Sequence, residues 1–200
     1  AGTTFNSIKT GITTAIGDVV VVMVGWTGNT STVTITDSAG NTYTAVGAAV
    51  ANGTTAFTQS FYARAATATT TLAINLAMGT STTNKAVGVA VITGALPVVD
   101  TTPTTATGTG TSATLTSPAV QAYDILFDVA TFNVGTTITG SSTTTNGRWT
   151  TEQQAAITTG TPLSFGYQIK PTTGATGTQS IAPTVGSSVA YATEAFTFLV

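Results

Sequence analysis

The segment Val19–Trp26 constrains this chain more than any other, because eight consecutive residues there carry no polar side chain. It has the length of one β-strand and falls far short of the roughly 18 apolar residues that a membrane-spanning helix needs. Valine is β-branched and favours extended backbone. A strand without polar alternation is typical of one that is covered on both faces. The segment therefore predicts a β-protein with a strand buried on both sides.

Alternating apolar and polar residues predict further strands along the whole chain. These lie at Phe57–Ala65, Thr69–Leu76, Ala86–Ile92, Tyr123–Val129, Leu163–Ile169, Ser180–Val185 and Ser188–Val200. Residues 31–47 predict a β-hairpin around the turn cluster Asp37–Asn41. Asp100–Ser112 is rich in Thr, Gly and Pro and predicts a long surface connection. The only segment with a helix-like pattern is the short stretch Thr151–Ala156.

The two halves of the chain resemble each other at a spacing of about 105 residues. Asp18 before the valine run parallels Asp124, and Ala86–Ile92 parallels 190–198. We predict a single jelly-roll-like antiparallel β-sandwich with this internal pseudo-repeat, and two separate sandwich domains are the alternative. Residues 1–16 would form an N-terminal strand or tail. The sandwich would span 17–200, with halves 17–99 and 117–200 joined by 100–116.

The composition excludes several functional classes. Only 6% of the residues are charged, with five Lys and Arg against seven Asp and Glu, and there is no His and no Cys. Scattered basic residues exclude a nucleic-acid partner, and a Ser nucleophile would lack its usual His base. We therefore predict a protein that is not an enzyme and has no cofactor, metal site or membrane span. With so few ionisable groups, its stability should depend weakly on pH.

Several motifs resemble a known domain type. Gly17-Asp18 before the valine run, TDSAGNTY at 36–43, Phe61–Arg64 and LPVVD at 96–100 resemble a secreted prokaryotic β-sandwich surface domain. This resemblance implies a jelly-roll-like fold at the cell surface and no shared activity. The size and Thr-rich composition also resemble subunits of archaeal thread-type filaments. In those filaments a terminal strand of one subunit completes the sheet of the next.

The N-terminal segment leaves three alternatives open. Ala1–Ile16 carries apolar residues at irregular spacing, including Phe5, Ile8 and Ile12. It could be a bulged edge strand of its own sandwich, a strand donated to a neighbouring subunit, or disordered. A start at Ala1 rather than Met is typical of a processed secretory protein.

From these features we predict an extracellular, cell-surface structural subunit. It would polymerise with copies of itself into a filament, with Phe5, Ile8 and Ile12 of a donated N-terminal strand filling an apolar groove. Low net charge leaves little repulsion to oppose such association. Covalent glycans at the sequons of Asn29 and Asn52 are a further prediction. The alternative function is a glycan-binding or adhesin module.

Other residues carry candidate chemistry with a plainer alternative. Four aromatic residues could stack on sugars, although core packing is more common: Trp26, Tyr43, Tyr62 and Trp149. Asp37 and Asn41 could bind Ca²⁺, although an Asx-type turn explains them as well.

The remaining residues with possible chemical roles are acids and lysines. Asp124 and Asp128 are expected on an outward, solvated face, about 13 Å apart and too far for a glycosidase pair. Glu152 or Glu194 could meet one of them in space. Three lysines could join an isopeptide bond but are expected to be simple exposed residues: Lys9, Lys85 and Lys170.

Overall fold

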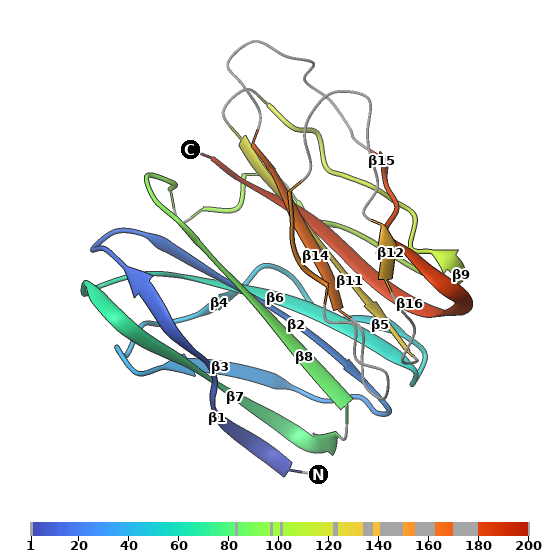
Figure 1. Cartoon of the computed structure of the whole chain (residues 1–200), viewed down its shortest axis with the longest axis horizontal. Coiled ribbons are helices and arrows are strands. Elements are labelled where there is room, and N and C mark those ends of the chain that lie inside the picture. The colour runs from blue at the N-terminus through green and yellow to red at the C-terminus, as the bar shows by residue number, and fades with distance from the viewer. Residues whose placement is uncertain are drawn as a thin grey trace.

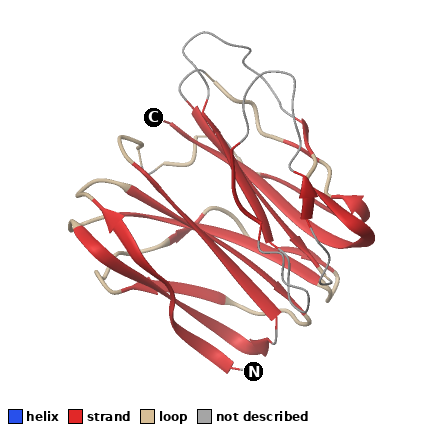
Figure 2. Ribbon diagram, viewed as in Figure 1, coloured by secondary structure: helices blue, strands red, loops and turns tan. Residues whose placement is uncertain are grey.

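The protein is all-β and antiparallel, as the sequence predicts, in a computed structural model that describes residues 2–82, 84–96, 98–100, 102–121, 124–133, 138–140, 150–154, 163–169 and 180–199. Sixteen strands and no helix lie in these ranges, so no described helix could cross a membrane (Figure 2). The strands are β1 (Gly2–Thr14), β2 (Val19–Thr27), β3 (Val33–Asp37), β4 (Thr44–Ala45), β5 (Val50–Asn52), β6 (Ala56–Arg64), β7 (Thr69–Thr82), β8 (Asn84–Ile92), β9 (Thr104–Ser112), β10 (Leu115–Thr116), β11 (Asp124–Phe132), β12 (Ile138–Gly140), β13 (Thr150–Gln154), β14 (Leu163–Ile169), β15 (Ser180–Ile181) and β16 (Thr184–Leu199).

The strands form four sheets, which we name A to D. Sheet A has the order β1-β7-β3, and sheet B has the order β4-β6-β2-β8 with β5 also paired to β6. Sheet C has the order β12-β16-β11-β14-β13 with β9 also paired to β16, and sheet D is the pair β10-β15. Figure 1 shows sheets A, B and C stacked in that order, so sheet B is the middle layer.

Strand β2 explains why sheet B lies in the middle. All nine of its residues are buried. Val20, Val22 and Val24 join a core with Leu72 and Leu76 of β7, so one face of β2 packs on sheet A. Neighbouring side chains on a strand point to opposite faces. The other face, which includes Val21 and Met23, accordingly packs on sheet C against residues that include Phe127 and Phe196. The predicted strand covered on both faces is confirmed.

The far face of sheet C is also covered. Leu115 and Val120 pack there against Leu126 and Ala195. Strand β11 is therefore buried along its whole length. The expectation that Asp124 and Asp128 are solvated is wrong: they are 0% and 5% exposed. Alternation places them on one face, as predicted, but the sequence did not reveal that a further layer covers that face.

The pseudo-repeat is visible in the strand pairing. Sheet B contains the order β6-β2-β8, and sheet C contains the corresponding order β14-β11-β16. Val21 lies opposite Tyr62 across β2 and β6, and Phe127 lies opposite Tyr167 across β11 and β14. The two halves thus share strand order and register, in agreement with the predicted spacing of about 105 residues.

The turns before β2 and β11 repeat the same hydrogen bond. The Ala15 amide donates to Asp18 Oδ2 at 2.8 Å, and the Gln121 amide donates to Asp124 Oδ2 at 2.6 Å. Each aspartate closes the turn that introduces the central strand of its half. This shared structural role explains why both halves place an aspartate directly before or at the start of an apolar strand.

Two secondary-structure predictions are wrong. Residues 31–47 do not form a hairpin, since β3 pairs with β7 in sheet A and β4 pairs with β6 in sheet B. The turn at Asp37–Asn41 instead carries the chain from one sheet to the next. Residues 151–154 of Thr151–Ala156, the only segment with a helix-like pattern, belong to strand β13.

The second error concerns Asp100–Ser112, which contains strand β9 rather than only a surface connection. Its residues alternate between half-buried and exposed positions, and Thr favours strands. A Cβ atom at Gly108 would lie only 2.6 Å from Tyr191 Oη and 2.8 Å from its Cζ. Glycine in this strand therefore marks the close approach of a tyrosine ring rather than a loop.

This close approach gives a matched pair of substitutions. Gly108→Ala should destabilise the fold by about 1–3 kcal/mol, because the Tyr191 ring must move out of its packing on Phe132. Gly110→Ala in the same strand should be nearly neutral, since its Cβ would meet atoms no closer than 3.7 Å. Urea unfolding of both variants measures the difference. Equal midpoints would contradict the packing described here.

Candidate functional site

Strand β1 is the edge strand of sheet A and pairs antiparallel with β7 of its own chain. The pairing has register shifts at four places, and Gly11 within the strand has a φ of 70°. Such bulges explain the irregular apolar spacing in the sequence. In this single chain the segment is therefore a bulged edge strand of its own sandwich.

The three predicted donor-strand residues lie on one apolar surface. Phe5, Ile8 and Ile12 are half-buried and pack on the core between sheets A and B. The Lys85 ammonium lies 3.5 Å from the centroid of the Phe5 ring, a cation–π contact that ties β1 to β8. A strand in the position of β1 thus covers β7 and this part of the core.

The two sequon asparagines differ in their surroundings. Asn52 Nδ2 donates to two backbone oxygens, that of Gly108 at 2.6 Å and that of Tyr191 at 3.2 Å. Both of its amide hydrogens are therefore used inside the fold. Asn29 Nδ2 makes an exposed bond to the Ser81 oxygen at 2.9 Å. The geometry at Asn29 leaves one amide hydrogen for a glycan, whereas a glycan at Asn52 would break the link between β5 and sheet C.

Replacing each asparagine with aspartate tests the difference in hydrogen bonding between Asn52 and Asn29. Asn52→Asp should destabilise the protein by about 2 kcal/mol or more, because a carboxylate oxygen would face two carbonyl oxygens. Asn29→Asp, with its exposed hydrogen bond, should cost about 0.5 kcal/mol or less. Thermal and urea unfolding report both values. A similar loss in the two variants would disagree with the hydrogen bonds at Asn52.

Asp37 and Asn41 form a structural turn. Asp37 Oδ1 accepts from the amides of Ala39 and Asn41, and its Oδ2 accepts from Asn41 Nδ2 and from the Tyr43 hydroxyl. Asn41 Oδ1 in turn accepts from the Ala66 amide. Burial and the neighbouring Asp37 carboxylate raise the pKa of Tyr43. Because these oxygens are already satisfied by donors of the protein, the geometry favours the Asx-type turn over Ca²⁺.

The described aromatic candidates are packed against other rings or polar groups. Trp26 is fully buried and stacks on Phe57 with a centroid distance of 5.2 Å. Half-buried Tyr62 contacts Phe198 edge to face. Trp149 lies outside the described residues, as does Lys170. The three described candidates thus take part in packing or hydrogen bonding within the fold.

The lysines differ from the simple exposed residues that we expected. Lys9 and Lys85 are half-buried. Burial lowers the pKa of Lys85, which contacts the Phe5 ring as described above. The role that the structure gives Lys85 is therefore packing against β1.

Glu194 does not meet the aspartates of β11. In β16 it lies opposite Val129, whereas Asp128 lies opposite Ala195. Because neighbouring residues of a strand face opposite ways, Glu194 points toward sheet B and Asp128 toward sheet D. The side chain of Glu152 lies outside the described part of β13.

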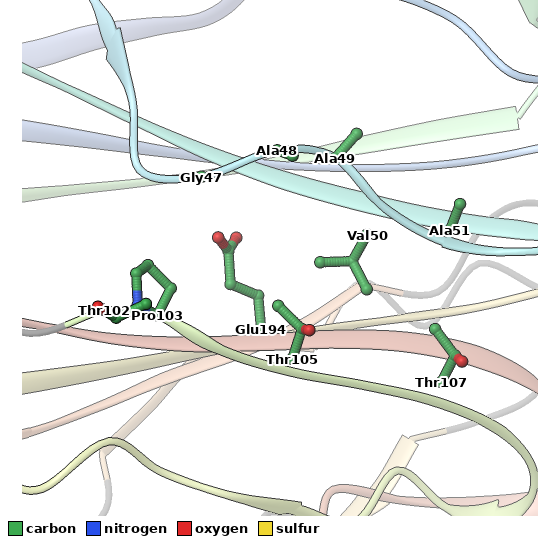
Figure 3. Close-up of a pocket in the computed structure, with 10 residues that line it drawn as sticks. All are labelled: Gly47, Ala48, Ala49, Val50, Ala51, Thr102, Pro103, Thr105, Thr107 and Glu194. Carbon is green, nitrogen blue, oxygen red and sulfur yellow. The ribbon is translucent and has the colours of Figure 1, made fainter.

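Glu194 instead belongs to a pocket of about 460 Å³. Residues 47–51 form one wall, while Thr102, Pro103, Thr105 and Thr107 form the other. Figure 3 shows the Glu194 carboxylate pointing from β16 into the space between these walls. The sequence signal for this site is a single acid within the otherwise uncharged strand Thr184–Leu199, which we weighed only as a partner for the aspartates.

The carboxyl group of Glu194 is in an unusual state. The residue is 0% exposed, and neither of its oxygens completes a hydrogen bond of good geometry. Burial raises the pKa of Glu194 to about 7, whereas hydrogen bonding from the nearby hydroxyl and amide of Ser60 lowers it. A group that changes charge near neutral pH inside a pocket is a candidate functional group.

Glu194 belongs to no cluster of metal-ligating side chains in the part of the chain that the structure describes. Within the described residues, no three His, Cys, Asp or Glu side chains lie together as a metal site. In comparisons with known proteins, no family model, no curated protein and no solved structure matched this chain.

Proposed function

We propose that this chain is an extracellular structural subunit that polymerises into a surface filament by exchanging its N-terminal strand. The observation that carries the proposal is the position of β1. It lies at the N-terminus and at the edge of sheet A, and among the described strands it pairs with β7 alone. A copy of β1 from a neighbouring subunit can occupy the same place and make the same contacts.

Such an exchange costs little free energy. Backbone hydrogen bonds to β7 and the packing of Phe5, Ile8 and Ile12 are kept, and only their donor changes. The turn between β1 and β2 contains Gly17 with a φ of 92°, so a rearrangement there needs no strained side chain. When each subunit gives its strand to the next, the contact is head to tail, and a filament results when the rotation between subunits does not close a ring.

Disulfide trapping tests the proposal directly. The chain has no Cys, so every disulfide of a Thr4→Cys/Ala77→Cys variant involves residues 4 and 77, which are paired between β1 and β7. Strand exchange should give a ladder of covalent multimers on non-reducing gels of assembled protein. A single monomer band from assembled material would mean that β1 stays in its own chain.

The control places the cross-link at the opposite edge of β7, between β7 and β3. Thr34 of β3 is also paired with Ala77, and β3 is not a terminal strand. A Thr34→Cys/Ala77→Cys variant should therefore give monomers under the same oxidation. Multimers from this control would show that the ladder of the first variant comes from random contacts.

A further inference from the structure

The pocket at Glu194 is large enough for a small organic molecule. Its volume of about 460 Å³ falls within the usual range of ligand pockets. It lies between the edge of sheet B, at residues 47–51, and the edge of sheet C, at β9. The two sheets are in contact through their central core but leave this space between their edges.

The buried carboxylate of Glu194 in this pocket is incompletely satisfied, with donors only from Ser60 among the described residues. Glu194 is completely buried, and although the Ser60 hydroxyl and amide lie close to its carboxylate, neither oxygen makes a hydrogen bond of good geometry with them. Buried polar groups in native proteins are nearly always satisfied, because an unpaired one is costly. A bound group that donates hydrogen bonds would remove this cost.

The surroundings of Glu194 indicate the charge of that group. The facing groups from β6, β9 and residues 47–51 are the hydroxyl and amide of Ser60, the side chains of Pro103 and Thr105, and the Gly47 backbone. None of these is charged. A cation from a ligand would therefore be the only positive partner of the carboxylate and would form charge-assisted hydrogen bonds with it.

The walls of the pocket indicate the remainder of the ligand. Val50 contributes its methyl groups on one side, where the Cβ atoms of Ala49 and Ala51 point away from the pocket, and Pro103 contributes its ring on the other (Figure 3). The described lining contains no aromatic ring for stacking on a sugar. A short alkyl chain fits these surfaces, and the threonine hydroxyls lie along β9 beside it.

We propose that this pocket binds a small molecule with a primary ammonium group on a short alkyl chain. The ammonium donates to the Glu194 carboxylate, and the alkyl chain packs against Val50 and Pro103. The proposal does not rest on strand exchange, because β1 belongs to sheet A and the pocket lies between sheets B and C.

Titration with n-butylammonium, followed by the methyl NMR signals of residues 48–51, tests the site at pH 8. We expect saturable shifts of these signals at millimolar concentration and at least tenfold weaker binding of 1-pentanol, which has a similar shape without the charge. Glu194→Gln, which keeps the side-chain size, should weaken n-butylammonium binding at least tenfold. Equal affinity for the alcohol, or unchanged affinity in Glu194→Gln, would overturn the proposal.

A second variant, Gly47→Ala, keeps the Glu194 carboxylate and adds a methyl group beside it. A Cβ at Gly47 would lie 3.5 Å from Glu194 Oε1 and 3.9 Å from Pro103 Cγ, which is ordinary contact. Gly47→Ala should therefore fold normally and yet reduce n-butylammonium binding severalfold. Absence of saturable shifts in the wild-type protein, or full binding in Gly47→Ala, would show that the ligand does not occupy the space at Glu194.

Discussion

Removal of residues 2–14 is expected to unfold the protein at 25 °C. The deletion strips β7 of one hydrogen-bonded neighbour and uncovers the apolar core around Leu72, Ile74 and Leu76. Loss of three half-buried apolar side chains alone costs about 3–5 kcal/mol, and the lost strand pairing adds to it. Total stabilities of about 5–15 kcal/mol leave little reserve for such a loss. Circular dichroism and urea unfolding measure the outcome.

A peptide with the sequence of β1 provides the decisive complement to the deletion. When added in trans, it should restore the sheet signal and give a discrete one-to-one complex, because the vacated place accepts a strand from outside the chain. A peptide with Asp at positions 5, 8 and 12 is the matched control and should restore nothing. A deleted chain that stays folded and assembles without the peptide would refute the role of β1.

The stability of the intact protein is expected to fall by about 3 kcal/mol between pH 4 and pH 8. Burial raises the pKa of Glu194 from its ordinary value of 4.5 to about 7 in the folded state. Between these values the unfolded chain loses this proton while the folded chain retains it, so stability decreases as pH rises. Each unit of difference corresponds to about 1.4 kcal/mol. Burial also raises the pKa of Asp124, which changes stability in the same direction.

Urea unfolding at a series of pH values in amine-free buffers tests this expectation. Glu194→Gln should remove most of the fall and be more stable than the wild-type protein at pH 8. Asp124→Asn changes a buried acid on the opposite face of sheet C and should retain most of it. A flat wild-type profile, or an unchanged slope in Glu194→Gln, would contradict the buried state of Glu194.

This result would also correct the expectation that stability depends weakly on pH. That expectation followed from the small number of ionisable groups. A single carboxyl group without exposure or a firm partner can outweigh many solvated ones, because its charged form is strongly disfavoured by burial. Composition alone does not show which of seven acids is placed in this way.

The local pattern of the sequence predicted the strands well and their partners poorly. The alternation of Phe57–Ala65 and the apolar run at Val19–Trp26 depend on local side-chain direction, which a sequence shows directly. The hairpin at 31–47 failed because strand pairing depends on which sheet each segment joins. The turn around Asp37 directs the chain into another layer, and no residue pattern within it reveals that change.

The candidate site was predictable only in part. Phe5, Ile8 and Ile12 were identified because apolar residues in a terminal segment need a surface to cover. The pocket was missed because its walls come from residues 47–51, β9 and β16, which are far apart in sequence. Glu194 is conspicuous as an acid among apolar neighbours, but its isolation from other acids appears only when the two faces of sheet C are distinguished.

The matching registers of β6-β2-β8 and β14-β11-β16 have a consequence for how the chain becomes stable. A half-length chain with sheets A and B alone would expose Val19, Val21 and Met23, and it could bury them only against a second molecule. Joining the two halves in one polypeptide replaces that encounter with an intramolecular one at high effective concentration. The internal interface therefore forms even at great dilution, where two separate halves would remain apart.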